Sequence, residues 1–135
     1  MSTASVTVLP RRTPPSILVV EGDVRLRCLV SDELRAMSFK VVEASSAREA
    51  LTVLDAVRID LLLLDLDLQP PGSGLDVIRH LHGNQPPTWI IGASSAADPM
   101  EELHGLELFI RKPYPISQVT ELVTRSLNWP QLPEA

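Results

Sequence analysis

The segment Leu61-Leu62-Leu63-Leu64-Asp65 decides the fold of this 135-residue chain. Four consecutive large apolar residues followed at once by a carboxylate are typical of a short strand that is buried on both faces. Such strands belong to parallel sheets covered by helices, because a sheet with one face in water alternates apolar and polar residues. The segment therefore predicts a parallel sheet in which one strand ends at Asp65.

Apolar runs alternate with amphipathic stretches on both sides of this segment. Further strands are predicted at residues 17–20, 39–44, 89–93 and 108–110. Helices are predicted at residues 23–37, 46–57, 75–81 and 116–127, and residues 99–105 have room only for a short one. Strand followed by helix five times over predicts an α/β fold, a doubly wound parallel sheet with helices on both faces.

The two ends of the chain differ in character from its middle. Residues 1–15 contain three prolines and no amphipathic period, so they predict a disordered tail. We expect one domain over residues 16–128 and a C-terminal tail over 129–135, with Trp129 packing that end onto the body. The initiating Met1 and the Pro-rich ending lead us to expect a whole small protein.

Packing of the first helix follows from the spacing of its apolar residues. Val24, Cys28, Leu29 and Leu34 recur at helical intervals and predict the face that lies on the sheet. Cys28 would then be a small apolar residue of the core.

Composition excludes several classes of protein. The net charge is −5 and the longest basic run is Arg11-Arg12, whereas a nucleic-acid-binding surface needs clustered cations. No apolar run approaches the roughly 20 residues that span a bilayer, and the N-terminus lacks the apolar core of a signal peptide. A single cysteine, Cys28, allows no intrachain disulfide. We expect a cytoplasmic protein that binds neither nucleic acid nor membrane.

Polar residues follow four of the strands, and the carboxyl ends of parallel strands meet at one edge of the sheet. They are Glu21 and Asp23, Asp65 and Asp67, Ser94, and Lys112. Gathered carboxylates repel unless a cation binds among them, and Mg²⁺ prefers oxygen ligands. A carboxylate nucleophile can attack a phosphoryl group whose oxygens are neutralised by a metal and a fixed cation. The pattern predicts acyl-phosphate chemistry, with Lys112 as the cation and Ser94 as a hydrogen-bond donor.

The same segments resemble the signature segments of the receiver domains of two-component response regulators, the CheY-like family. The resemblance covers roughly residues 16–127 and rests on five segments in order, SILVVEGD (16–23), DLLLLDLDL (60–68), GSGLDVIRHL (72–81), IIGASSAAD (90–98) and LFIRKPY (108–114). It implies a flavodoxin-like sheet of order 2-1-3-4-5 and a phosphoprotein of phosphorelay signal transduction.

The resemblance also assigns roles to single residues. Asp65 would be the phosphoacceptor, which carries the aspartyl phosphate, and Lys112 the conserved-type lysine of the family. Ser94 would be the switch hydroxyl and Phe109 the switch aromatic. The acidic site for Mg²⁺ would comprise Glu21, Asp65 and Asp67, whose backbone carbonyl faces the metal in the family. The Lys112-Pro113 bond would be the family's cis peptide.

Partners follow from the same resemblance. A histidine kinase or a histidine phosphotransfer protein would supply the phosphoryl group, and a downstream protein target would receive the signal by contact. A weak homodimer is compatible with the family. The protein would not be an enzyme beyond its self-catalysed phosphotransfer.

Gly22 is the main departure from the family pattern, which has a second carboxylate there. Mg²⁺ binding is therefore expected to be weak, unless the Asp67 carboxylate compensates for the missing ligand. Asp23, one residue further on, is well suited to cap the first helix. The loop from Asp65 to Gly74 is one residue longer than usual, and the fourth helix is shortened by about one turn.

Two alternatives remain open. A degenerate receiver would act as a phosphorylation-independent binding module, and Gly22 motivates this hypothesis. A haloacid-dehalogenase-like phosphatase would use Asp65 as nucleophile and Asp67 as general acid. The position of the motif in mid-chain and the lack of room for a cap domain argue against the phosphatase.

Overall fold

The structure is a computed structural model that describes residues 13–84, 89–96, 106 and 108–129. The short helix predicted at residues 99–105 lies outside these residues, as do residues 1–12 and 130–135 of the predicted tails.

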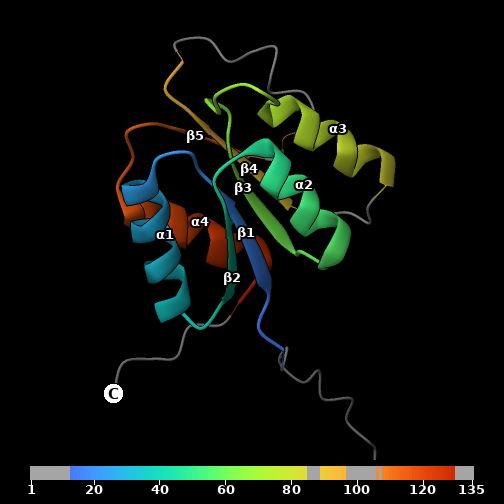
Figure 1. Cartoon of the computed structure of the whole chain (residues 1–135). Coiled ribbons are helices and arrows are strands. Elements are labelled where there is room, and N and C mark those ends of the chain that lie inside the picture. The colour runs from blue at the N-terminus through green and yellow to red at the C-terminus, as the bar shows by residue number, and fades with distance from the viewer. Residues whose placement is uncertain (1–12, 85–88, 97–105, 107, 130–135) are drawn as a thin grey trace, which may run out of the picture.

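Five parallel strands form one sheet of order β2-β1-β3-β4-β5, and the predicted fold is confirmed (Figure 1). In chain order the elements are β1 (Ser16–Val20), α1 (Val24–Ala36), β2 (Lys40–Ala44), α2 (Ala47–Ala56), β3 (Leu61–Asp65), α3 (Gly74–Asn84), β4 (Trp89–Ser94), β5 (Leu108–Arg111) and α4 (Ile116–Leu127). Strand order reverses between β1 and β3, so the ligand crevice of this fold lies outside the carboxyl ends of these two strands.

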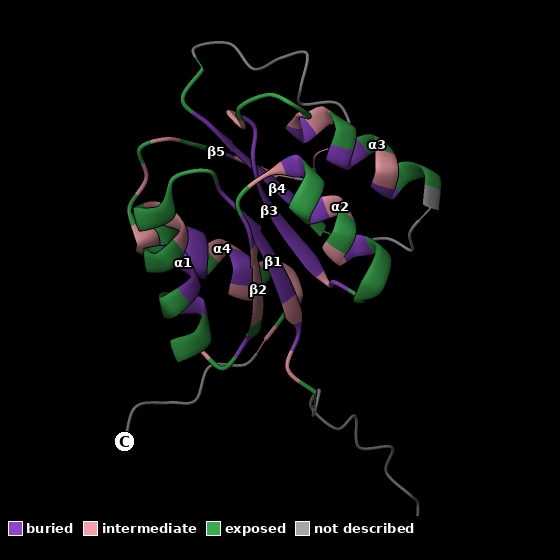
Figure 2. Ribbon diagram, in the orientation of Figure 1, coloured by how far each residue is buried: buried purple, intermediate pink, exposed green. Residues whose placement is uncertain are grey.

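Helices cover both faces of the sheet. Figure 1 shows α1 and α4 on one face and α2 and α3 on the other. Each face has its own apolar cluster, and every residue of β3 is buried, as Figure 2 shows. Burial on both faces explains why β3 is an unbroken apolar run, and it places Asp65 at the end of a rigid central strand.

Helix α1 packs on the sheet through a face that includes only Leu34 of the four predicted residues. Leu26, Val30 and Leu34 face the core, whereas Val24 and Leu29 are 57% and 60% exposed. Cys28 is exposed as well, so its assignment to the core is wrong. The packed residues are spaced i, i+4 and i+8, and they lie roughly opposite Cys28 on the helix.

Polar caps fix the starts of two helices beside the sheet edge. Asp23 caps α1, its Oδ1 accepting hydrogen bonds from the backbone N–H groups of Arg25 (2.9 Å) and Leu26 (3.2 Å). Ser46 caps α2 by accepting a hydrogen bond from the backbone N–H of Glu49 at 3.2 Å. Both caps satisfy amide groups that the first helical turn leaves without partners.

The C-terminal end of the described chain packs on the domain body through Trp129. Its ring lies 6.0 Å, centroid to centroid, from that of Phe39, and its indole N–H donates to the carbonyl of Met37 at 3.3 Å. The predicted core packing of Trp129 is confirmed. None of the helices in the described part of the chain has the length and apolar character to cross a bilayer.

Candidate functional site

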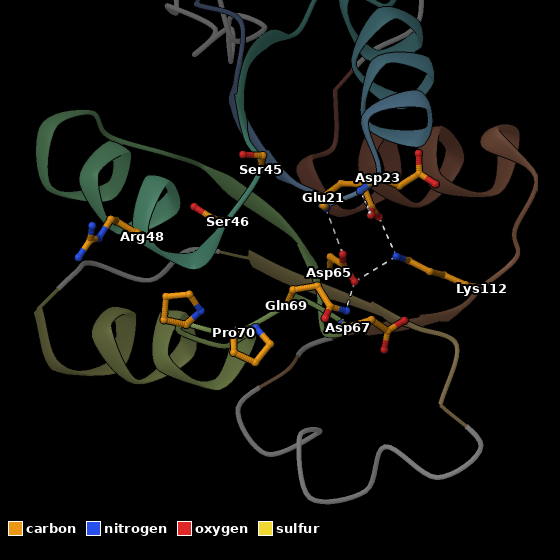
Figure 3. A pocket seen from close by; sticks show the side chains of 12 residues that line it. Glu21, Asp23, Ser45, Ser46, Arg48, Asp65, Asp67, Gln69, Pro70 and Lys112 are labelled. Atoms are coloured by element: carbon orange, nitrogen blue, oxygen red, sulfur yellow. Dashed lines mark hydrogen bonds and ion pairs between the residues drawn. The ribbon is translucent and has the colours of Figure 1, made fainter.

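Asp65 ends β3, is only 4% exposed, and accepts hydrogen bonds from three separate segments (Figure 3). Its Oδ1 accepts from the Lys112 ammonium at 3.0 Å and from the backbone N–H of Asp67 at 2.8 Å. Its Oδ2 accepts from the backbone N–H of Gly22 at 3.2 Å. Two backbone amides and a lysine therefore fix the orientation of one buried carboxylate.

Glu21 lies beside Asp65 because β1 is the neighbour of β3 in the sheet. The Lys112 ammonium is 2.8 Å from Oε1 of Glu21, and Oε2 accepts from the backbone N–H of Asp23 at 2.9 Å. Lys112 thus bridges two buried carboxylates, and Figure 3 shows its side chain reaching both from the end of β5.

The electrostatics of this cluster follow from burial and from the lysine. Burial raises the pKa of Glu21, and the hydrogen bonds from Lys112 and Asp23 offset only part of that rise. Burial alone would lower the pKa of Lys112, but the carboxylates of Glu21 and Asp65 outweigh it and raise that pKa. Lys112 is therefore a permanent positive charge at neutral pH, which two carboxylates share.

The Asp67 side chain belongs to a second cluster, with the end of β4. Its Oδ1 accepts from the Ser94 hydroxyl at 2.7 Å. Its Oδ2 accepts from the backbone N–H of Ser95 at 2.8 Å and from the Ser95 hydroxyl at 2.9 Å. Burial would raise the pKa of Asp67, but the hydrogen bonds from Ser94 and Ser95 outweigh it and lower the pKa.

The structure does not bring the Asp67 carboxylate together with those of Glu21 and Asp65 as metal ligands. Within the described ranges, no three His, Cys, Asp or Glu side chains gather closely enough to hold a metal ion. Ser95, which the sequence places at the same strand end but to which no role was assigned, explains the difference, because its amide and hydroxyl hold the Asp67 carboxylate at the end of β4. Its position directly after Ser94 was the one available signal.

Gly22 leaves space beside the phosphoacceptor candidate. A Cβ built on Gly22 would lie 3.7 Å from Oδ2 of Asp65 and 4.0 Å from the carbonyl oxygen of Ser45, both ordinary contact distances. A cavity of about 620 Å³ opens there, as Figure 3 shows from close by. Its wall is formed by Glu21, Gly22, Asp23, Ser45, Ser46, Arg48, Asp65, Asp67, Gln69, Pro70, Pro71 and Lys112. The cavity is wide enough to admit a phosphoryl group to Asp65.

The chemistry of the two carboxylates at this edge fits Mg²⁺. Mg²⁺ in proteins commonly binds one or two carboxylates and keeps several waters. Glu21 and Asp65 supply two carboxylates beside the cavity. Both oxygens of Glu21 and Oδ2 of Asp65 each accept one of the hydrogen bonds described above and keep a second lone pair, whereas Oδ1 of Asp65 accepts two. The third acidic ligand is lacking because Gly22 has no side chain.

The remaining predicted residues frame the site. Phe109 on β5 is half-buried and packs against the cluster that α2 and α3 cover. The Lys112-Pro113 peptide bond is cis, and so is the Pro70-Pro71 bond, which the sequence analysis did not anticipate. Arg27 was also missed: its guanidinium donates to the backbone carbonyl of Glu21 at 2.9 Å and helps to fix the end of β1.

The chain is similar to known proteins over most of its length. Residues 17–124 match the family model described as the response regulator receiver domain. The regulatory protein VirG of Agrobacterium tumefaciens (strain 15955) is 28% identical over 106 residues, which cover 76% of this chain and 39% of VirG. The match thus spans less than half of that relative.

Two solved structures share the fold. A response regulator receiver protein from Pseudomonas putida is 30% identical, with a TM-score of 0.76, and the match covers 85% of this chain and 99% of that one. The response regulator TrrA of Thermotoga maritima, solved in complex with Mg²⁺-BeF, is 24% identical with a TM-score of 0.73, and the match covers 82% and 97%.

Proposed function

This chain belongs to the response regulator receiver family, and we propose that it accepts a phosphoryl group on Asp65 and passes the signal on by protein contact. The single observation that carries this proposal is the Lys112 ammonium 3.0 Å from Oδ1 of Asp65, at the mouth of an open cavity. Formation of an acyl phosphate requires at least a carboxylate nucleophile with a fixed cation beside it, and here the carboxylate is buried.

The proposed reaction transfers one phosphoryl group to a carboxylate oxygen. The backbone N–H groups of Gly22 and Asp67 and the Lys112 ammonium donate to the Asp65 carboxylate and hold it at the cavity. One of its oxygens attacks phosphorus, the bond from phosphorus to the donor's nitrogen or oxygen breaks, and the donor leaves with that electron pair. Lys112 stabilises the negative charge on the transferred group, because its raised pKa keeps it protonated.

Mg²⁺ is the cofactor that the family and the two carboxylates suggest. Glu21 and Asp65 would hold it, with water in the place that Gly22 leaves open, and we propose that it binds weakly. When bound, Mg²⁺ would neutralise charge on the phosphoryl oxygens. Because Gly22 lacks the carboxylate of the family pattern, we retain a second proposal, in which the domain binds its partner without phosphorylation.

The partners we propose are a histidine kinase or a histidine phosphotransfer protein as donor, and a downstream protein as target. We also propose that the chain turns over no substrate other than its own phosphoryl group, and that it works in the cytoplasm. The lone cysteine of the sequence supports a reducing compartment.

Chemical labelling tests the phosphoacceptor. After exposure to a small phosphodonor with and without Mg²⁺, the wild-type chain should carry an acid-stable phosphoryl group that base and hydroxylamine remove. Asp65→Asn should abolish the label, whereas Asp32→Asn, the same change at an exposed position of α1, should keep it. Label that persists in Asp65→Asn would refute the assignment. An unlabelled wild type would favour the phosphorylation-independent module.

A further inference from the structure

We propose that Asp67 is a positioning residue that holds the Ser94 hydroxyl until a phosphoryl group on Asp65 competes for it. This inference rests on the proposed function, because it concerns how easily the phosphorylated state forms. It assigns to the Asp67 carboxylate a role in the response of the domain rather than in metal binding.

The Ser94 hydroxyl already donates its proton in a hydrogen bond in this structure. Ser94 is buried, with 0% exposure, at the end of β4. Its Oγ donates to Oδ1 of Asp67 at 2.7 Å and accepts from the backbone N–H of Ala96 at 3.0 Å. A hydroxyl has a single proton to donate. Ser94 therefore cannot bind a phosphoryl oxygen until it leaves Asp67.

Asp67 is itself held in place from two sides. The backbone N–H and the hydroxyl of Ser95 fix its Oδ2, and its own backbone N–H donates to Oδ1 of Asp65 at 2.8 Å. One residue thus contacts the phosphoacceptor through its backbone and the switch hydroxyl through its side chain. A change at Asp65 therefore reaches Ser94 through two hydrogen bonds, one from the Asp67 backbone N–H to Asp65 and one from Ser94 to the Asp67 carboxylate.

The strength of this hold follows from its charge. Hydrogen bonds to an ionised carboxylate are roughly twice as strong as neutral ones. Breaking the bond between Ser94 and Asp67 therefore opposes formation of the phosphorylated state. Removing the acceptor should raise the affinity of a phosphoryl mimic about tenfold, which corresponds to about 1.4 kcal/mol.

Two substitutions separate the hydrogen bond from the charge. Asp67→Ala removes both the negative charge and the acceptor for Ser94. Asp67→Asn removes the same charge but keeps a carbonyl oxygen that can accept from Ser94. Neither variant alters the backbone N–H that contacts Asp65. Ser95→Ala is the matched control, because it removes one of the three bonds to the carboxylate and leaves the charge unchanged.

The assay is titration of each protein with beryllium fluoride at saturating Mg²⁺, followed by NMR of the Ser94 and Ser95 amides. Asp67→Ala should bind about threefold more tightly than Asp67→Asn, because the neutral amide holds Ser94 about half as strongly as the carboxylate does, and Ser95→Ala should lie within about twofold of wild type. Without beryllium fluoride, amide hydrogen exchange at Ser95 should be faster in Asp67→Ala than in wild type, because the Ser95 N–H loses its acceptor.

The outcomes separate this inference from the proposed function. Equal affinities for Asp67→Ala and Asp67→Asn, with wild type binding normally, would show that only charge matters and would overturn the role of Asp67 alone. A lack of beryllium fluoride binding in wild type and all variants would overturn the proposed function, and this inference with it.

Discussion

Replacing Lys112 with methionine tests how the acidic edge of the sheet is held together. The Lys112 ammonium lies 2.8 Å from Oε1 of Glu21 and 3.0 Å from Oδ1 of Asp65. The two acidic residues are only 5% and 4% exposed, so water can replace the lost cation only in part. Lys112→Met removes the charge, keeps an unbranched side chain, and leaves two neighbouring carboxylates without a counter-ion.

We expect Lys112→Met to lower the free energy of unfolding at pH 7 by about 3 kcal/mol. Removing one partner of a buried ion pair typically costs about 3–5 kcal/mol. The lower end applies here, because the backbone N–H groups of Gly22, Asp23 and Asp67 still donate to the two carboxylates. The Lys112 side chain is also 15% exposed, which allows solvent to screen part of the interaction.

The loss of unfolding free energy in Lys112→Met should depend on pH, and the pKa of Glu21 sets the direction of that dependence. Its pKa is already raised by burial, and without Lys112 it should rise further. Between the unfolded and folded pKa values the folded state then binds more protons than the unfolded state, so stability falls as pH rises. The deficit of Lys112→Met relative to wild type should therefore shrink as pH is lowered from 7 toward 5.

Urea unfolding followed by the fluorescence of Trp129, which packs on Phe39, measures this free energy. A second change, Asp65→Asn, removes one of the two uncompensated charges and should recover at least about 1 kcal/mol in the Lys112→Met background. A loss below about 0.5 kcal/mol, or a double variant less stable than Lys112→Met, would show that these carboxylates do not depend on Lys112.

Three further predictions follow from the site and the core. Gly22→Asp should tighten Mg²⁺ binding about tenfold, or about 1.4 kcal/mol, and slightly destabilise the metal-free protein, because a carboxylate fits the open space and repels its neighbours. Equal Mg²⁺ affinities of variant and wild type in isothermal titration calorimetry would show that Gly22 is neutral. Ser31→Ala should leave the free energy of unfolding unchanged or raise it by up to about 1 kcal/mol. The reason is that the Ser31 hydroxyl is fully buried with no hydrogen-bond partner among the described residues. A loss above about 1 kcal/mol in urea unfolding would contradict this. Trp129→Ala should lower the free energy of unfolding by about 2–3 kcal/mol, because the indole packs on Phe39 and donates to the carbonyl of Met37. The loss should be smaller than for a fully buried tryptophan. An unchanged thermal unfolding curve by circular dichroism would show that Trp129 does not stabilise the fold.

The sheet could be predicted from the sequence because its central strands β1 and β3 contain short unbroken apolar runs, whereas the face of α1 could not be predicted. Two apolar stripes compete on that helix. One contains Val24 and Cys28, and the other contains Leu26 and Val30, two positions further along each time. The second stripe packs on the sheet, although it brings the polar Ser31 into the core beside Val30. Periodicity alone does not separate two stripes of similar length on opposite faces.

Residue types at the candidate site could likewise be predicted, but not the direction of every side chain. Parallel strands place Glu21 and Asp65 at one edge wherever their side chains point, so their proximity follows from topology. The direction of the Asp67 carboxylate depends on Ser94 and Ser95, which are 27 and 28 residues away in the chain. Such a choice between competing partners is decided by tertiary geometry rather than by local pattern.

The outward position of Cys28 has a practical consequence. It is the single cysteine of the chain, and it lies on the solvent side of α1, the helix that begins directly after the acidic edge. A thiol-specific fluorophore or spin label would therefore attach at one defined point of the native sequence, without any engineered cysteine. Because packing of α1 rests on Leu26, Val30 and Leu34 instead, a label there would report on events at the edge while leaving the core intact.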